Sequence, residues 1–222
     1  MRRIAIAGVV CACTALPLGG LARAAGIVTP PAGTPNLALM VIQPADLVAG
    51  ATLVTQGYVK APKSFAADYS SEFGLVQTDD GTKLDALEDD VALADSSTDA
   101  NLYFAGQEAL FGTRSGQKRL VKILIKTSPK RDRLTRKEIR FGASTSAGVG
   151  PSSFVETVYF TIRHVRFQQV VLLFDAGTID ASVVLTGTPN AAVPQSSAID
   201  LGETVSAHIA STLGATGATG TT

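Results

Sequence analysis

The feature that most constrains the fold is the segment 153–187, which is dominated by Val, Ile, Phe, Tyr and Thr. Such β-branched and aromatic residues favour strands, and Asp175-Ala176-Gly177 supplies the turn of a β-hairpin within the segment. After this turn, apolar residues from Ile179 to Leu185 alternate with polar ones. The alternation predicts a strand with one dry face and one mostly wet face, which is typical of an antiparallel sheet.

Further strands and helices are predicted before this segment. Residues 51–59 and 83–95 have the composition or the alternation of strands. The segment 95–111 opens with serine and threonine capping candidates and continues as an apolar stripe, which predicts a helix. The segment 115–126 fits an alternating strand as well as a helix capped by Ser115, and we favour the helix.

Three aromatic residues, Phe65, Tyr69 and Phe73, recur at every fourth position within residues 62–73. This spacing lines one face of a helix, so a short helix is predicted here. The stripe would suit an aromatic platform that stacks a sugar or a base, or a helix that docks on the sheet. We favour docking, because buried aromatic residues commonly anchor cores.

The last apolar segment predicts a closing amphipathic helix. It begins at Ser197 and has Asp200 three residues later. Its apolar residues recur at helical spacing, at Leu201, Val205, Ile209 and Leu213. Helices combined with antiparallel hairpins give an α+β domain. We therefore expect an antiparallel sheet with helices packed mainly on one face and an amphipathic C-terminal helix.

The first residues have the layout of a secretory signal peptide. Arg2 and Arg3 precede an apolar run from Ile4 to Leu18, and the small-residue triplet Ala22-Arg23-Ala24 follows. The apolar run is too short to span a bilayer as a helix, so we expect an exported, extracytoplasmic protein without a transmembrane helix in its mature chain. Ordinary export is favoured over a twin-arginine or lipoprotein route. The expected parts are a signal peptide at 1–24, a flexible spacer at 25–35, one α+β domain at 36–213 and a flexible tail at 214–222.

Removal of the signal peptide changes the charge and the cysteine content of the chain. Arg2, Arg3 and Arg23 leave with it, so 16 basic residues stand against 19 acidic ones. General nucleic-acid binding rests on counterion release by a basic surface, so nucleic acid is excluded as a partner. Cys11 and Cys13 leave as well, which excludes a thiol enzyme and a disulfide in the mature chain.

The charged residues are segregated into two blocks. Glu72 to Glu108 contains ten acidic residues and one basic residue, whereas Arg114 to Arg140 contains eleven basic and two acidic residues. The two blocks either pair with each other across the fold or leave the basic block for an anionic partner. Such a partner would be a phosphate-bearing envelope polymer, lipid headgroups or another envelope protein. A solvated mixed-charge loop around Pro129 is the interpretation that the sequence favours. The candidate anion-binding residues are Lys130, Arg131, Arg133, Arg136, Lys137 and Arg140.

The sequence offers little for catalysis or metal binding. His164, expected in a strand, and His208, expected in the closing helix, are the two candidate bases at neutral pH, and no G-x-S-x-G elbow accompanies them. Zinc-ligand spacing is lacking, and the acidic run from Asp85 to Asp99 lacks EF-hand spacing and is typical of a wet strand face. We expect no cofactor, no metal and no catalysis. The alternatives are a secreted hydrolase with an unrecognised site and a passive structural surface protein.

The order of these segments resembles that of a known group of proteins. The stretches "QPADLVAGATLVTQGYV", "YSSEF", "SGQKRLVKILIK" and "FDAGTIDASVVLTG", followed by a terminal helix, span about Gln43 to Leu213. This layout is similar to uncharacterised exported proteins of high-GC Gram-positive bacteria and, loosely, to extracellular sensor-like and lipoprotein domains of mycobacteria. The resemblance implies an exported, non-catalytic binding or sensor-like module of the cell envelope.

Export makes a direct prediction about the mature chain. N-terminal sequencing of the protein recovered from the cell envelope or the culture medium should begin at Ala25, because the small residues before it suit signal peptidase. An intact chain that begins at Met1 and accumulates in the cytosol would contradict this prediction.

Overall fold

The computed structural model describes residues 28–47, 51–77, 83–128, 134–162, 164–188 and 192–218, so the predicted signal peptide lies outside the described residues. The strands are β1 (Thr52–Val59), β2 (Phe65–Gln77), β3 (Lys83–Ala94), β4 (Ile139–Phe141), β5 (Ser152–Ile162), β6 (Val165–Ala176) and β7 (Ile179–Gly187). The helices are α2 (Ser97–Gly112), α3 (Arg114–Thr127) and α4 (Gln195–Ala218), with short 3-10 helices η1 (Leu37–Leu39), η2 (Pro44–Asp46) and η4 (Arg136–Glu138).

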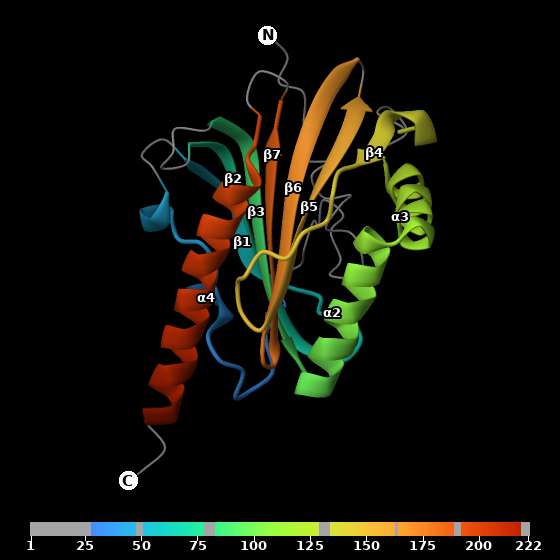
Figure 1. Cartoon of the computed structure of the whole chain (residues 1–222). Coiled ribbons are helices and arrows are strands. Elements are labelled where there is room, and N and C mark those ends of the chain that lie inside the picture. The colour runs from blue at the N-terminus through green and yellow to red at the C-terminus, as the bar shows by residue number, and fades with distance from the viewer. Residues whose placement is uncertain are drawn as a thin grey trace.

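The strands form one antiparallel sheet in the order β1-β2-β3-β7-β6-β5-β4. Strand β7 therefore lies between β3 and β6, and it joins the N-terminal strands to the C-terminal ones (Figure 1). The predicted α+β class, the antiparallel sheet and the C-terminal helix are confirmed. The hairpin turn predicted at Asp175-Ala176-Gly177 is also confirmed, since it connects β6 to β7.

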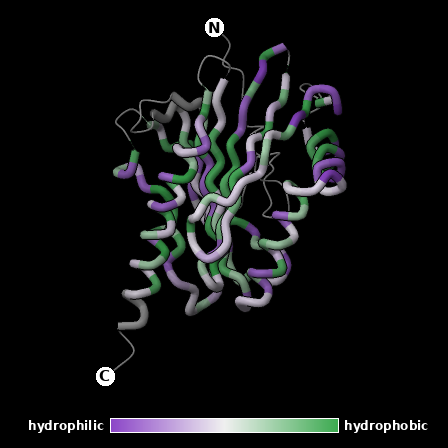
Figure 2. The backbone as a smooth tube through the Cα atoms, viewed as in Figure 1, coloured by the Kyte–Doolittle hydropathy of each residue, from purple (hydrophilic) through white to green (hydrophobic). Residues whose placement is uncertain are grey.

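Strand β7 is buried along its whole length. A wet face was expected at Asp180 and Ser182, but this prediction is wrong, because these residues are only 3% and 1% exposed. Helices cover both faces of the sheet, with α4 on one face and α2 and α3 on the other (Figure 1). The expectation that helices pack mainly on one face is therefore corrected, and Figure 2 shows a predominantly hydrophobic centre to the sheet.

Helix α4 and one face of the sheet form the first core. Alternate residues of a strand point to opposite faces, and Val170, Leu172 and Phe174 of β6 point to the α4 side. The helix contributes the apolar repeat that the sequence predicted, with Leu201, Val205 and Ile209 buried and Leu213 packed at the edge. The segment around η1 closes this core with Leu37, Met40, Val41 and Ile42.

Helices α2 and α3 form the second core on the opposite face. Val171 and Leu173 of β6 point to this side. The ring of Phe154 in β5 lies 5.7 Å from the ring of Phe104 and 5.7 Å from that of Phe111, measured between centroids, so α2 docks through its aromatic residues. From α3 the core takes Leu120, Val121 and Leu124.

The helix predicted over residues 62–73 is wrong, because this segment belongs to β2. A spacing of four places residues on one side of a strand as well as of a helix. The pairing of β2 with β3 shifts between Phe65 and Ala67, and such a bulge re-aims the side chains that precede it. Phe65 therefore packs in the α2 core, whereas Tyr69 and Phe73 pack in the α4 core, so the three rings make no common platform.

Several boundaries differ from the prediction. His164 lies in the turn between β5 and β6 with a positive φ of 69°, not within a strand. The cap of α3 is Thr113, whose hydroxyl accepts a hydrogen bond from the Gly116 amide, rather than Ser115. Helix α4 begins before the predicted Ser197 and continues to Ala218, into the segment expected to be a flexible tail.

The contact between α4 and β6 can be tested at Gly202. A Cβ atom built on Gly202 would lie 2.1 Å from Cδ2 of Leu172, a fully buried side chain. We expect Gly202→Ala to lower the free energy of unfolding by about 1–3 kcal/mol through overpacking, as measured by urea denaturation. Gly106→Ala in α2 is the matched control, because nothing lies within 4 Å of its Cβ position, and it should stabilise by up to about 1 kcal/mol. Equal effects of the two substitutions would contradict the close packing.

Candidate functional site: a basic face

The structure describes three of the six residues predicted to bind an anion. Arg136 and Lys137 lie in η4 and Arg140 lies in β4, all with exposed side chains. Lys130, Arg131 and Arg133 lie outside the described residues. The predicted segment is therefore observed at its C-terminal end, where η4 leads directly into the edge strand β4.

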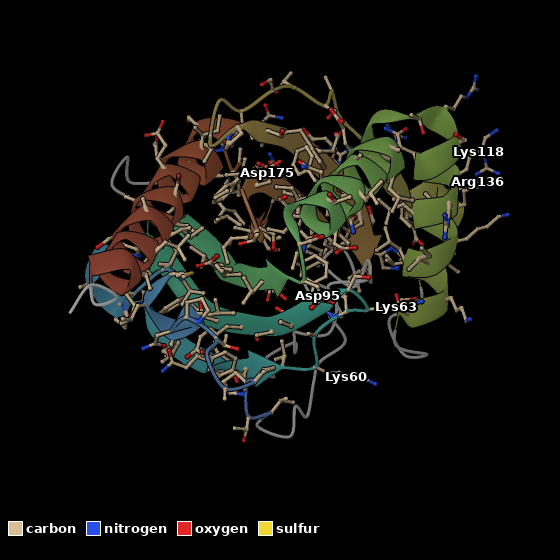
Figure 3. All side chains as sticks on the ribbon, turned by 90° about the horizontal axis from the view of Figure 1, so that it is seen from below. Lys60, Lys63, Asp95, Lys118, Arg136 and Asp175 are labelled. Carbon is tan, nitrogen blue, oxygen red and sulfur yellow. The ribbon has the colours of Figure 1, made fainter. Side chains whose placement is uncertain are left out.

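Helix α3 brings more cations to the same side of the molecule. Its apolar residues are buried against α2 and the sheet, so its charged residues point outward. Helix α3 also packs against η4, and Lys118 of α3 and Arg136 of η4 project from the same side of the molecule in Figure 3. We call this surface the basic face. Its members are Arg114, Lys118, Arg119, Lys122, Lys126, Arg136 and Lys137, all exposed. Arg140 is exposed as well, but its neighbours Ile139 and Phe141 pack in the α2 core, so it points to the other face of the sheet.

The hydrogen bonds around α3 and η4 fix the orientation of the basic face. The hydroxyl of Thr113 donates to the carbonyl of Ala109 over 2.6 Å, which ties the start of α3 to the end of α2. At the other end, the Leu134 amide donates to the hydroxyl of Ser128 over 3.1 Å, and Leu134 is buried in the α2 core. The cations are therefore carried by a helix and a loop that are both anchored to the second core.

The basic face is not neutralised by carboxylates of the described residues. Its nearest acidic residue in sequence is Glu138, whose carboxylate accepts hydrogen bonds from the amide and hydroxyl of Thr135, both over 2.7 Å. Among the residues that the structure describes, no ion pair joins a cation of the basic face to Asp or Glu. Exposed like charges at this density attract anions, an effect that weakens with salt.

Three carboxylates of the acidic block, Glu88, Asp89 and Asp90 of β3, are buried, so the wet face predicted for this strand is wrong at these positions. The register aligns Asp68, Ala92, Asp180 and Asp175 in one row across four neighbouring strands, β2, β3, β7 and β6. The neighbours of Asp180 belong to the α4 core, so Asp180 points to the α2 side. We call the buried carboxylates on this side the acidic layer, which consists of Asp68, Glu88, Asp90, Asp175 and Asp180.

Burial raises the pKa of two groups here, Asp180 of the acidic layer and Tyr103 beside it. Desolvation, with a smaller contribution from the charge of Asp175, raises the pKa of Asp180 to about 7. Tyr103 of α2 faces the layer, and burial together with the charges of Asp180, Asp68 and Asp90 raises its pKa. The hydroxyl of Ser182 donates to Asp90 over 3.5 Å. Asp180 therefore favours its protonated form more than an exposed carboxylate does.

The two histidines have separate and local surroundings. Nδ1 of His208 donates to the carbonyl of Val41 over 3.1 Å, and its Nε2 lies 3.6 Å from a carboxylate oxygen of Asp46. His208 thereby fastens α4 to the segment around η2. His164 lies at the far hairpin turn and is exposed. Within the described part of the chain, no group of three or more His, Asp or Glu side chains is arranged to hold a metal ion.

Comparisons with known proteins find limited similarity to a solved structure. No family model and no curated protein matches the chain. Among solved structures, the extracellular domain of PknH from Mycobacterium tuberculosis is similar with a TM-score of 0.49 and 5% identity, covering 84% of this chain and 98% of that one. At this level of similarity we transfer no function. Helices that are both long and apolar enough to cross a membrane are lacking among the described residues.

The acidic layer predicts that stability falls as the pH rises. The pKa of Asp180 is raised from 3.8 to about 7, so its contribution to stability is complete below the unfolded-state pKa and is lost as the pH rises through 7. The loss is on the order of 4 kcal/mol at most. Because Asp180→Asn cannot titrate, its free energy of unfolding should depend less steeply on pH than that of the wild type, as measured by urea denaturation between about pH 4 and pH 8.

Asp200→Asn is the matched control for this measurement. Asp200 is exposed on α4, so the substitution removes the same charge without touching the acidic layer. The pH profile of this variant should follow that of the wild type. An equally steep profile for Asp180→Asn and the wild type would contradict protonation of Asp180 in the folded state.

Proposed function

We propose that the protein is an exported, non-catalytic binding module that attaches to a phosphate-bearing surface of the cell envelope through the basic face. The observation that carries this proposal is a set of seven exposed cations on α3 and η4 without a carboxylate partner among the described residues. The charge distribution also favours it, because most described carboxylates near the sheet centre are withdrawn into the acidic layer.

The chemistry of the basic face fits phosphate better than carbohydrate or an apolar ligand. Arginine offers a planar, bidentate fork to phosphate, and lysine acts as a mobile point charge. Each such residue near an anionic membrane contributes about 1 kcal/mol to attachment. A rigid helix that presents several of them gives a binding energy that is large at low salt and small at high salt.

Charge reversal on α3 tests the proposal. We expect the purified protein to sediment with vesicles that contain phosphatidylglycerol, and to be released at high salt or from vesicles of phosphatidylcholine alone. Lys118→Glu with Lys122→Glu should weaken binding at least tenfold, consistent with about 1 kcal/mol for each charge removed. Binding to long-chain polyphosphate in solution is measured in parallel, which distinguishes a polymeric partner from lipid headgroups.

The matched control reverses two cations away from the basic face. Lys60→Glu with Lys63→Glu makes the same change in net charge at exposed positions in the connection between β1 and β2, at the opposite edge of the sheet from β4, and it should leave binding within about twofold of the wild type, because charges far from the contact are screened. Equal losses of affinity in the two double variants would show that net charge alone accounts for binding. That result would overturn the proposal, and so would a wild-type protein that binds neither the vesicles nor polyphosphate.

A further inference from the structure

A polar groove lies on the other side of α2 from the acidic layer and shares no residue with the basic face. Its first wall is one stripe of α2, where Asn101, Phe104, Ala105 and Glu108 follow helical spacing. Its second wall is the loop between β4 and β5, from Ser144 to Pro151, together with the first residues of β5. The groove is partly open to solvent and has a volume of about 500 Å³, within the range that holds a small ligand.

The groove exists because β4 is much shorter than β5. Only Val158 to Phe160 pair with β4, so the first half of β5 is bordered by the loop instead. A single bridge between Thr145 and Val155 holds the loop to this edge, through hydrogen bonds of 3.0 and 2.8 Å. The loop therefore stands beside the sheet edge rather than continuing the sheet, and it leaves a space against α2.

Local constraints keep the loop in this position. The amide of Val149 donates to the hydroxyl of Ser153 over 3.0 Å, and Val149 itself is buried in the α4 core. Gly150 has a φ of +66°, and a Cβ at this position would lie 2.4 Å from the carbonyl oxygen of Asp175. The hydroxyl of Thr145 lies 3.4 Å from the Gln195 side chain, at the start of α4. The loop is thus anchored at both ends and at its tip, so the wall is preformed.

The lining of the groove has a consistent chemistry. Hydroxyl groups predominate, with an amide and one carboxylate beside them and no Lys, Arg or His in the lining. The hydroxyl-bearing residues are Ser144, Thr145, Ser146, Ser152 and Ser153. Ala105 and Pro151 are exposed and supply the apolar part, whereas Phe104 and Phe154 are only 8% and 2% exposed. Short hydroxyl side chains lose little conformational entropy when they order around a ligand.

We propose that this groove binds a neutral carbohydrate, as a short oligosaccharide segment. A sugar ring presents many hydroxyl groups at its rim and apolar C–H groups on its faces, which matches hydroxyl, amide and carboxylate partners around a partly apolar lining. Glu108 accepts hydrogen bonds from hydroxyl groups, and charge-assisted hydrogen bonds of this kind are the strong ones. The same carboxylate, without any cation beside it, disfavours phosphorylated and acidic ligands.

The groove is tested by titration with defined disaccharides. Maltose, cellobiose and N,N′-diacetylchitobiose are each added to the purified protein up to tens of millimolar, and backbone amide shifts are followed by NMR. We expect at least one disaccharide to shift amides on both walls, at Asn101, Ala105, Gly148 and Gly150, with a Kd of about 1 mM or tighter. An acidic disaccharide prepared from hyaluronan should bind at least tenfold more weakly than that neutral ligand.

Two tryptophan variants on α2 test whether the disaccharide binds in the groove or elsewhere on the surface. Ala105→Trp fills the groove from an exposed position, and it should weaken binding at least tenfold. Leu102→Trp places the same ring at an exposed position on the same helix that does not line the groove, and it should bind as the wild type does. Thermal unfolding of both variants verifies that the fold is kept.

Three results of these titrations would contradict or limit carbohydrate binding in the groove. No amide shift with any of the three neutral disaccharides, or shifts that survive Ala105→Trp, would overturn the groove as a carbohydrate site. Tight binding of the acidic disaccharide would overturn the proposed ligand class. In that case Glu108→Gln should leave the affinity for the acidic disaccharide unchanged rather than raise it. Attachment to anionic vesicles does not depend on this groove, so both tryptophan variants should retain it.

Discussion

Coverage of the sheet on both faces is the constraint on which the rest of this structure depends. Strand β7 lies in the middle of the sheet and is buried from end to end, so each of its residues faces either the α4 core or the side covered by α2. Once both faces are dry, polar residues on the strands have no access to water and must be accommodated by protonation and hydrogen bonds. The acidic layer follows from this arrangement, and so does the outward orientation of the cations on α3, the helix that completes the second core.

The fold thereby separates opposite charges rather than pairing them. Carboxylates from four neighbouring strands gather beneath α2, and the cations collect on α3 and η4, where they remain solvated. A chain whose formal net charge is zero consequently presents a strongly positive surface on one side. Net charge governs general properties such as solubility, whereas the local distribution governs which partners are attracted. The polar groove, which carries the carboxylate of Glu108, adds a second surface with a different chemistry, and both surfaces depend on α2 for their position.

Much of the architecture could be predicted from periodicity and turn chemistry, and the errors have physical causes. The hairpin at Asp175 and the stripe on α4 are strong signals because a turn or a long repeat fits only one structure. The spacing of Phe65, Tyr69 and Phe73 fits both helix and strand, and only the bulge in β2 divides these rings between two cores. The alternation in β7 predicts the strand correctly, but a polar residue such as Asp180 gives no local sign that a distant helix covers it.

The cations of the candidate site can be predicted from the sequence, but the surface that they share cannot. The density of cations near Arg136 is visible in the sequence, and so is the helical spacing of Lys118, Lys122 and Lys126. Their common surface is created by the packing of α3 against η4, which sequence proximity alone does not show. The strand order has one more consequence. Because β7 is synthesised last among the strands yet pairs with β3, Ala86 must find Thr186, which lies 100 positions further along the chain. Contacts so remote along the polypeptide slow the search for the native state, and β3 cannot complete its pairing with β7 until nearly all of the chain has been synthesised.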